Sequence, residues 1–267
     1  MAHSTVVIPC FNEARRLPAE RIQALGHHPS VDLVLVDDGS TDGTSLALER
    51  ICRALPLGKA RLLVLERNCG KAEAVRRGLL AALEMGSDFV AYLDADLATP
   101  GEEMLRILGV LESGSVHAAL GSRVAVLGTH IERSATRHYL GRFFATVASL
   151  ILHLPVYDTQ CGAKAFRAGP ALAAALSTPF HARWAFDVEL IGRLLAAGLT
   201  AEDFIEVPLR RWVDVAGSRL RPLQFPLLGW ELFRIHLVLA RFRRNAEMAR
   251  VPKALAPAVG DVQEDVG

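Results

Sequence analysis

Cysteines and long apolar runs are scarce in this sequence of 267 residues. It contains four cysteines and no CxxC pair, which argues against a disulfide framework and is typical of free thiols in a reducing compartment. No uninterrupted apolar run reaches the roughly 18 residues that a membrane-spanning helix needs, so we expect no such helix. The first residues also lack the basic and apolar segments of a signal peptide. Together these absences predict a cytoplasmic location.

The chain has no large excess of charge of one sign. Its formal net charge is +1 at pH 7, which provides no general attraction to nucleic acid, so we expect no nucleic-acid partner. Basic residues are nevertheless concentrated near the end, because residues 219–253 contain eight Lys or Arg against two acids. Such a local excess in an apolar segment indicates an anionic substrate or a membrane surface as partner.

Two common nucleotide-binding loops are also missing. No GxxxxGK loop occurs, and no GxGxxG follows a predicted strand. The segment ERNCGKAEAV places Gly70 and Lys71 at the start of a predicted helix, where free N–H groups and the helix dipole favour anions. Lys71 is therefore a candidate anion-binding residue, and the alternative is a solvated surface lysine.

Apolar, strand-like runs alternate with helical patterns over the first 125 residues. This alternation predicts an α/β protein with a parallel, doubly wound sheet in that region. The predicted strands cover residues 4–10, 31–37, 61–66, 88–94 and 117–123.

The pattern changes after residue 125, and no internal repeat or flexible linker separates the two halves. The predicted elements there are a helix over 132–153, a strand within 158–168, a helix over 186–198, a strand over 202–212 and a helix over 222–244. Pro208 predicts an edge position or a bulge for the last strand. We expect one main domain over residues 1–221, an apolar C-terminal helix over 222–246 and a disordered tail over 247–267.

Paired carboxylates follow two of the predicted strands. In VLVDDGST the apolar run ends at Asp37 and Asp38, and in LDADLATP it ends at Asp94 and Asp96. Ligands of open α/β sheets bind outside the carboxyl ends of the strands. Asp94 and Asp96 point the same way in extended geometry, and two converging carboxylates repel unless a cation lies between them. These residues predict a Mg²⁺ or Mn²⁺ site shared with substrate phosphates, and the alternative is solvated loop acids.

Other polar groups follow the first strand and the later elements. Asn12 and Glu13 can present polar atoms at the sheet edge, unless they form an ordinary turn. Arginines outside a regular surface pattern suit phosphate binding, although about half of them are expected to be plain surface charges. Asp187 lies near a predicted helix start, where capping is the alternative to a functional role.

Eight segments occur in the order found in one enzyme family: VVIPCFNEARRL, VLVDDGSTDGT, NCGKAEAVRRG, LDADLATP, GSR, DTQCGAKAFR, RWAFDVEL and DVAGSRL. On these motifs the chain resembles the inverting family 2 glycosyltransferases over residues 4–245, and it is most similar to their dolichyl-phosphate glucosyltransferase branch. The resemblance implies a GT-A fold: a Rossmann-like, nucleotide-binding domain with a mostly parallel central sheet flanked by helices and with C-terminal interfacial helices.

The resemblance also implies roles for individual residues. Asp94, Asp96 and Asp187 would be catalytic, with Asp96 as the main metal ligand and Asp94 as the second. The nucleotide sugar would be bound by Pro9, Phe11, Asn12, Glu13, Asp37, Asp38, Gly39, Lys71, Asp94, Ala95, Asp96 and Arg123. The phosphates or the acceptor would be bound by Arg133, Arg137, Gln160, Lys164 and Arg219.

The sequence departs from the family pattern at several positions. Arg219 replaces a lysine, Ala163 replaces an aromatic residue, and Ala98 stands where related mannosyl enzymes carry an amide near the metal. Eukaryotic relatives also carry an N-terminal membrane anchor that is not found here. The first three departures concern the phosphate, acceptor and metal contacts.

The implied reaction is transfer of a hexose, expected to be glucose from UDP-glucose, to a polyprenyl phosphate in the membrane, with inversion and with Mg²⁺ or Mn²⁺. A phosphate acceptor is already anionic and needs no strong general base. The alternatives are mannosyl transfer from GDP-mannose, transfer to a soluble acceptor, a sugar-phosphate nucleotidyltransferase, and a non-catalytic nucleotide-binding subunit. The first loop lacks the glycine-rich sequence that a nucleotidyltransferase needs.

The C-terminal helix has two interpretations. Glu231, Arg234 and Arg241 are predicted to share one narrow face and to leave a wide apolar surface, as in a helix that lies in the membrane interface. This interpretation predicts a peripheral protein at the inner face of the membrane. The alternative is a helix packed in the core or in the interface of a homodimer.

Overall fold

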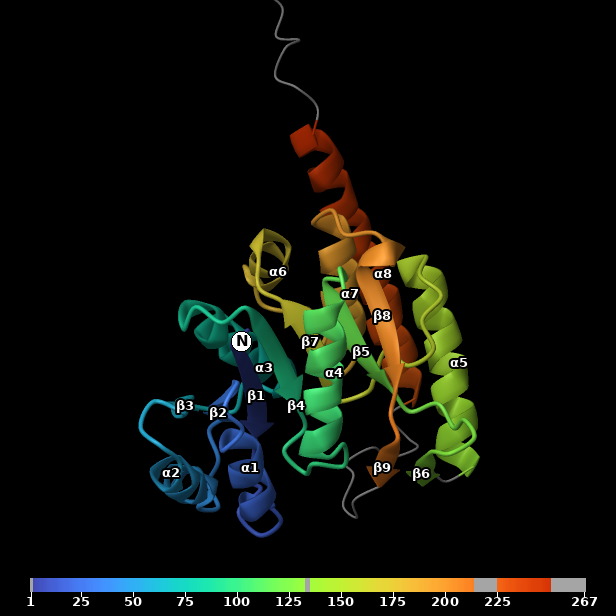
Figure 1. Cartoon of the computed structure of the whole chain (residues 1–267). Coiled ribbons are helices and arrows are strands. Elements are labelled where there is room, and N and C mark those ends of the chain that lie inside the picture. The colour runs from blue at the N-terminus through green and yellow to red at the C-terminus, as the bar shows by residue number, and fades with distance from the viewer. Residues whose placement is uncertain (1, 133–134, 214–224, 251–267) are drawn as a thin grey trace, which may run out of the picture.

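A mixed seven-stranded sheet forms the centre of the protein (Figure 1). The computed structural model describes residues 2–132, 135–213 and 225–250. The strands are β1 (Ser4–Cys10), β2 (Val31–Asp37), β3 (Ala60–Val64), β4 (Phe89–Leu93), β5 (Ala118–Ser122), β6 (His130–Glu132), β7 (Ala163–Arg167), β8 (Phe204–Pro208) and β9 (Arg211–Val213). The strand order of the main sheet is β3-β2-β1-β4-β7-β5-β8, and β6 pairs with β9 in a second, two-stranded sheet.

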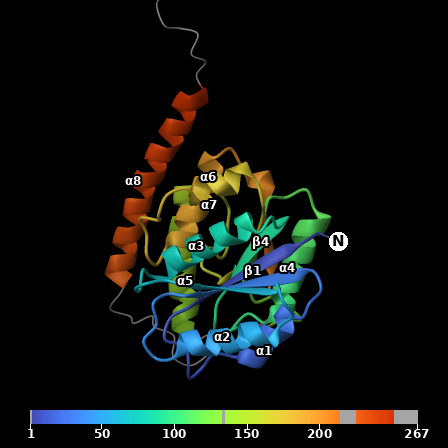
Figure 2. The ribbon, with the colours of Figure 1, turned by 90° about the vertical axis from the view of Figure 1, so that its left-hand side faces the viewer.

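Helices cover both faces of the main sheet. They are α1 (Ala19–Gly26), α2 (Thr44–Ala54), α3 (Lys71–Glu84), α4 (Gly101–Ser113), α5 (Ala135–Leu152), α6 (Pro170–Leu176), α7 (Phe186–Ala196) and α8 (Phe225–Arg250), with a short 3-10 turn, η1, at Ala201–Asp203. In Figure 2 the helices α1 and α2 lie on one side of the sheet, whereas α3, α6 and α7 lie on the other and α8 is outermost.

Of the apolar strands predicted in the first half, β1, β2, β4 and β5 are buried on both faces, whereas β3 at the edge of the sheet is partly exposed. In β1, Val7 belongs to the apolar cluster that also contains residues of α3, α5, α6, α7 and α8, whereas Val6 and Ile8 belong to the cluster on the other face, with residues of α1, α2 and α4. A strand buried on both faces needs a continuous apolar run, which is the pattern seen in β1, β2 and β4. The expected α/β class is confirmed.

The first five predicted strands all run in the same direction, as the prediction of a parallel sheet requires, but the fifth is not next to the fourth. Strands β1, β2, β3 and β4 are mutually parallel, but β5 does not pair with β4. Strand β7 lies between them and is antiparallel to both. Alternation along the sequence predicts which residues form strands, but the position of each strand depends on packing between distant segments.

The single strand predicted over 202–212 is two strands in two sheets. Strand β8 ends at Pro208 and forms the edge of the main sheet, as expected for a strand that contains a residue without an N–H group. The chain then continues into β9, which pairs in parallel with β6.

The two long predicted helices form as α5 and α8. Helix α8 extends through Arg250, beyond the predicted boundary at residue 246. Within the described residues, no helix combines the length and the apolar character that crossing a bilayer requires. The predicted tail lies, from residue 251 onward, outside the described residues.

A glycine in α3 allows this helix to pack closely on β1 and β2, and it provides a test of the packing. A Cβ at Gly78 would overlap Val7 Cγ1, so we expect Gly78→Ala to lower the free energy of unfolding by about 1–3 kcal/mol. Gly109 in α4 is a matched control with nothing within 4 Å of such a Cβ, and alanine there should stabilise by about 0.5–1 kcal/mol. Urea unfolding of both variants measures the two effects. Equal changes in the free energy of unfolding would contradict the close contact between Gly78 and Val7.

Candidate active site at the carboxyl edge of the sheet

The loops after β1 and β2 are bonded to each other at the carboxyl edge of the sheet. Because Cys10 pairs with Asp37 in parallel register, the two strands end side by side. The backbone N–H of Asn12 donates to Ser40 Oγ at 3.0 Å, and Asn12 Oδ1 accepts from the N–H of Thr41 at 2.9 Å. Asp37 Oδ1 in turn accepts from the N–H of Ser40 at 2.9 Å. The polar residues predicted for the nucleotide are therefore brought together.

Glu13 is buried and is paired within its own loop. Its carboxylate forms an ion pair with Arg16, and its backbone N–H donates to Thr44 Oγ1 at 2.8 Å. Pro9 and Phe11 are half-buried in the same region. The nucleotide-binding roles of these residues stay predictions, but Glu13 has a definite structural partner.

Asp38 and Gly39 hold the loop that precedes α3. The two carboxylate oxygens of Asp38 accept from the N–H groups of Cys69 and Gly70 at 2.7 and 2.8 Å. Gly39 has a φ of 65°, and a Cβ there would overlap the backbone of Arg67. The second carboxylate of the DDGS motif is therefore engaged in fixing the position of Lys71, which the sequence did not predict.

Lys71 and the Asp94–Asp96 pair lie at the centre of this edge. Lys71 Nζ is 2.5 Å from Asp94 Oδ1. Burial alone would lower the pKa of Lys71, but the negative charges of Asp94 and Asp187 raise it, so the lysine stays protonated. Lys71 is thus a charged group at this edge, paired with Asp94 although its side chain is 44% exposed, and its anion-binding role stays a prediction.

Asp96 follows Asp94 in a tight turn. Leu97, with a φ of 47°, donates its N–H to the backbone carbonyl of Asp94 at 3.0 Å, and the N–H of Ala98 donates to Asp96 Oδ1 at 3.0 Å. Burial, and then the negative charge of Asp94, raise the pKa of Asp96. Ala95, between the two acids, is buried. The sequence predicted that the two charges act on each other, but its assumption of extended geometry is wrong, because the two acids lie in a turn.

The residues present fit a hard divalent cation. Carboxylate oxygens are the ligands that Mg²⁺ and Mn²⁺ prefer, and such ions are commonly held by one or two carboxylates together with substrate phosphates. Within the described parts of the chain, no group of three His, Cys, Asp or Glu side chains is arranged to hold a metal. Asp94 and Asp96 would therefore supply the protein ligands, and the substrate would supply the others.

Strand β7 enters the site beside Asp94. Gly162 accepts a hydrogen bond from the N–H of Asp94 at 2.9 Å, and a Cβ at Gly162 would overlap the Asp94 carboxylate. The DTQCG segment therefore needs a glycine at this position, because its backbone lies against the carboxylate of Asp94. The motif was visible in the sequence, but nothing in it indicated which side chain would lie against the glycine.

Asp187 is a buried partner of two groups from the sheet. Its Oδ1 accepts from Lys164 Nζ at 2.8 Å and from the hydroxyl of Tyr92. Burial and the charge of Asp187 raise the pKa of Tyr92 well above its usual range, so the phenol stays a neutral donor. Asp187 is not the helix cap, because Ala185 occupies the N-cap position of α7.

Lys164 lies in the interior and not on the surface. Its side chain is fully buried, and Nζ also donates to the carbonyl of Cys161 at 2.5 Å. Lys164 therefore balances the charge of Asp187, and its predicted phosphate contact stays a prediction that this arrangement does not favour. The sequence could not indicate this burial, since a lysine in a strand is usually exposed.

Arg123 is also held by an acid that the sequence analysis did not select. Its guanidinium forms two bonds with the carboxylate of Asp158, at 2.7 and 2.8 Å. Glu206 on β8 accepts from the N–H groups of Tyr157 and Asp158. These bonds fix the loop that contains Gln160, whose buried Nε2 has no hydrogen-bond partner among the residues that the structure describes.

Three predicted acceptor-site residues are not placed by the structure. Arg133 and Arg219 lie outside the described residues, as does the side chain of Arg137. Their proposed contacts with phosphate therefore stay predictions.

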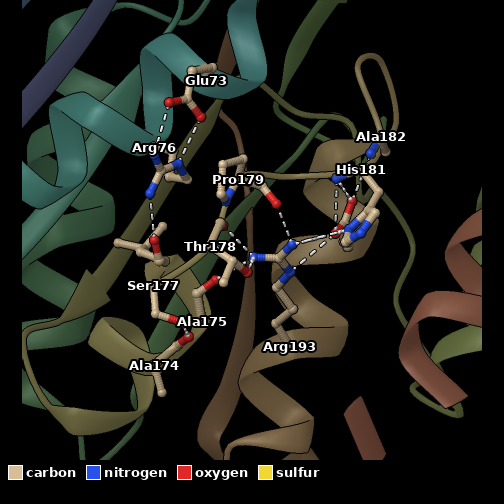
Figure 3. A network of polar contacts seen from close by, with 12 residues as sticks. Glu73, Arg76, Ala174, Ala175, Ser177, Thr178, Pro179, His181, Ala182 and Arg193 are labelled. Carbon is tan, nitrogen blue, oxygen red and sulfur yellow. Dashed lines mark hydrogen bonds and ion pairs between the residues drawn. The ribbon is translucent and has the colours of Figure 1, made fainter. Parts of the chain in front are cut away.

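A second polar network joins α7 to the end of α6 and to the segment that follows it (Figure 3). Glu189 and Arg193, both fully buried, form an ion pair at 2.7 Å. Arg193 also donates to the carbonyls of Ala175, Thr178 and Pro179. Glu189, from the RWAFDVEL motif, is thus structural, and the network fixes the chain that leads into α7.

Comparison with solved structures establishes the class of fold. Glucosyl-3-phosphoglycerate synthase from Mycobacterium tuberculosis, in complex with Mn²⁺, UDP-glucose and phosphoglyceric acid, superposes with a TM-score of 0.67 and 20% identity, covering 90% of this chain and 80% of that one. A mannosyltransferase from Pyrobaculum calidifontis, in complex with GDP-Man and Mn²⁺, gives a TM-score of 0.56 and 20% identity, covering 92% and 73%. The protein has the GT-A fold of the glycosyltransferases, as the sequence predicted.

Sequence comparison establishes the family. The model described as "Glycosyl transferase family 2" matches residues 5–171, so the chain belongs to glycosyl transferase family 2. A dolichyl-phosphate beta-glucosyltransferase from Mus musculus is 32% identical over 249 residues, 87% of this chain and 74% of that protein. The polyprenol monophosphomannose synthase of Mycolicibacterium smegmatis is 29% identical over 84% of this chain and 85% of that one. The expected resemblance is confirmed, and the chain is an enzyme of the transferase class.

Proposed function

We propose that the protein transfers glucose from UDP-glucose to a polyprenyl phosphate, with inversion and with a divalent cation. The observation that carries this proposal is the cluster of Lys71, Asp94 and Asp96 at the sheet edge. Relatives named as dolichyl-phosphate beta-glucosyltransferases support glucose as the sugar and a polyprenyl phosphate as the acceptor, since they match over more than two thirds of both chains.

The chemistry needs charge compensation more than proton transfer. Transfer breaks the bond between the sugar and the nucleotide diphosphate, and the acceptor phosphate attacks the anomeric carbon from the opposite side. A divalent cation held by Asp94 and Asp96 would supply positive charge to the departing diphosphate. Lys71, protonated and at the same edge, adds a second positive charge. The acceptor is anionic at neutral pH, so none of the carboxylates has to act as a strong base.

A donor and acceptor panel tests the proposal directly. UDP-glucose, other UDP-sugars and GDP-mannose, each carrying a radiolabelled sugar, are incubated with a short polyprenyl phosphate and with Mg²⁺ or Mn²⁺. We expect labelled glycolipid from UDP-glucose, formed with metal and not with EDTA. Labelled glycolipid from GDP-mannose alone would show that the donor is GDP-mannose and not UDP-glucose, in line with the mannose synthase relative. Metal-dependent nucleotide release with soluble acceptors only would overturn the proposed acceptor.

Gly162 offers a test of the Asp94 environment. Gly162→Ala would push the Asp94 carboxylate out of its position, so we expect the Mn²⁺-dependent affinity for UDP to fall about tenfold or more. Isothermal titration with and without Mn²⁺ measures this effect. Gly169→Ala is the matched control, because nothing lies within 4 Å of a Cβ there. Unchanged affinity in Gly162→Ala would contradict a ligand role for Asp94.

The outer surface of α8 supports the proposal that the protein binds the membrane as a peripheral protein. Trp230, Phe233 and Leu237 are exposed at helical spacing, and Arg234 and Arg241 are exposed on the same side. Aromatic and basic side chains on one helix face are typical of helices that lie in an anionic lipid interface. A homodimer interface is the alternative use of this surface.

Vesicle flotation distinguishes the two uses. We expect Trp230→Ser combined with Phe233→Ser to reduce flotation on anionic vesicles at least about tenfold, because both side chains are exposed and contribute apolar area to the contact. Leu57→Ser, at a fully exposed apolar position outside α8, should leave flotation unchanged. Unaltered flotation together with a shift from dimer to monomer would favour the homodimer.

A further inference from the structure

The carboxylate of Glu231, on α8, lies at the N-terminus of α7. Its oxygens accept hydrogen bonds from the backbone N–H groups of Arg183 at 3.2 Å, Trp184 at 3.1 Å and Ala185 at 2.9 Å. The first N–H groups of a helix have no partner within the helix, and no side chain of the α7 N-cap residue supplies one. Ala185 is the N-cap residue of α7, and Arg183 and Trp184 come just before it, so Glu231 holds the segment that enters α7 and caps its first N–H group from a different helix.

This position corrects the predicted face of α8. The sequence placed Glu231 on one narrow face with Arg234 and Arg241, but the structure turns Glu231 toward α7 and leaves the two arginines exposed. Within the described residues, Glu231 forms no ion pair with a Lys, Arg or His side chain. Its charge is instead stabilised by backbone N–H groups at the positive end of the α7 dipole.

Helix α8 is also packed tightly along the rest of α7. A Cβ at Gly192 would overlap the side chain of Leu239, so the two helices approach as closely as a glycine allows. Farther along, the Arg193 guanidinium lies 4.9 Å from the centre of the Phe242 ring. The two helices thus form one packed unit, in which Glu231 provides the polar contact at the end that faces the site.

The first turn of α7 carries Asp187, two residues after the last N–H group that Glu231 accepts. Asp187 bonds Lys164 and Tyr92, and its charge acts on Lys71. A shift of this first turn would therefore move the Asp187 carboxylate relative to the edge of the sheet. Misplacement of about 1 Å can lower the rate of an enzyme about a hundredfold.

We propose that Glu231 is a positioning residue for Asp187: it fixes the first turn of α7 from α8, and thereby the place of the Asp187 carboxylate in the site. The activity test of this role rests on the proposed glucosyl transfer. The role makes α8, the helix with the exposed aromatic and basic surface, a structural part of the active site.

The test compares Glu231→Ala and Glu231→Gln with a matched carboxylate elsewhere. Asp203 also accepts backbone hydrogen bonds at a helical turn, from the N–H of Thr200 at 2.7 Å, and it makes no contact with α7 or α8 among the described interactions. Asp203→Ala therefore removes a capping carboxylate from η1 and leaves α7 and α8 unchanged. The measurements are kcat and KM for UDP-glucose, the melting temperature, and hydrogen exchange of the amides at 163–165 and 183–190 without substrate.

We expect Glu231→Ala to lower kcat about ten- to a hundredfold with KM for UDP-glucose changed less than kcat, because the loss concerns placement and not donor binding. Glu231→Gln should recover most of the rate, since its amide oxygen still accepts hydrogen bonds. Hydrogen exchange should rise at 183–190 and at 163–165 in Glu231→Ala only. Asp203→Ala should show a lower melting temperature with wild-type kcat.

The outcomes separate this proposal from the proposed function. A wild-type kcat for Glu231→Ala overturns the positioning role, as does an equal loss of kcat in Asp203→Ala. If the wild-type protein forms no glycolipid, the proposed function fails, and the exchange data then decide on positioning alone. Exchange that rises at 183–190 without a change at 163–165 overturns it, because Glu231 would then be a local cap only.

Discussion

Replacing Asp96 with alanine is expected to lower the rate of sugar transfer about a thousandfold, with the fold intact. Asp96 is the predicted main ligand of the divalent cation, and its charge already interacts unfavourably with that of Asp94 when no cation lies between them. Loss of one preorganised electrostatic group at a reacting centre costs about 10²- to 10³-fold in rate, and loss of a bound metal removes several such contributions together. The measurement is the initial rate of glycolipid formation at saturating metal, with titration of Mn²⁺ and UDP.

A matched control comes from the opposite end of the same strand. Asp88 precedes β4, accepts a hydrogen bond from the N–H of His3 at 2.8 Å, and lies at the amino edge of the sheet. Asp88→Ala should keep the transfer rate within about twofold, because ligands of such sheets bind at the carboxyl edge. A rate above one tenth of wild type in Asp96→Ala, with unchanged Mn²⁺ affinity, would show that Asp96 is not the metal ligand.

Replacing Arg193 with methionine is expected to lower the free energy of unfolding by about 3–5 kcal/mol. The side chains of Arg193 and Glu189 are 1% and 0% exposed, so the variant leaves a carboxylate without its cation in the interior (Figure 3). Three backbone carbonyls, those of Ala175, Thr178 and Pro179, also lose a donor. Urea denaturation monitored by circular dichroism measures the loss.

The control for this variant is an ion pair with the same spacing on the surface. Arg53 and Glu49 are also four residues apart in a helix, but their side chains are 74% and 43% exposed. Exposed pairs of this kind contribute about 0.3–0.5 kcal/mol, so Arg53→Met should have a small effect. If the two variants lost similar free energies of unfolding, burial would not determine how much the Arg193–Glu189 pair contributes to stability.

The carboxyl edge of the sheet could be predicted because its signals are local. Buried parallel strands need continuous apolar runs, and the acids that follow them must then lie at one edge. Asp37 ends one such strand and Asp94 follows another, and Lys71 begins a helix whose first turn faces the same edge. No knowledge of distant contacts was needed for this part of the site.

The supporting contacts could not be predicted, because each depends on the pairing of distant segments. The Lys164–Asp187 pair requires β7 to lie beside β4 and α7 to pack behind it. The cap of Glu231 on α7 spans 46 residues or more of sequence. Periodicity predicts that a side chain is on the polar face of a helix, but it cannot indicate that a backbone N–H group from another helix will bind it.

The position of β7 also determines the order in which the sheet can assemble as the chain leaves the ribosome. Strands β1 to β4 can pair with one another as soon as residue 93 has emerged. Strand β5 emerges next, but its neighbours are β7 and β8, so it stays unpaired until the chain reaches residue 163. During that interval one edge of β4 and both edges of β5 are open in the nascent protein, and open edges of apolar strands are sites of aggregation. The alternating pattern of the first 125 residues resembles a complete domain. A fragment that ends there nevertheless lacks β7, the strand that joins β4 to β5.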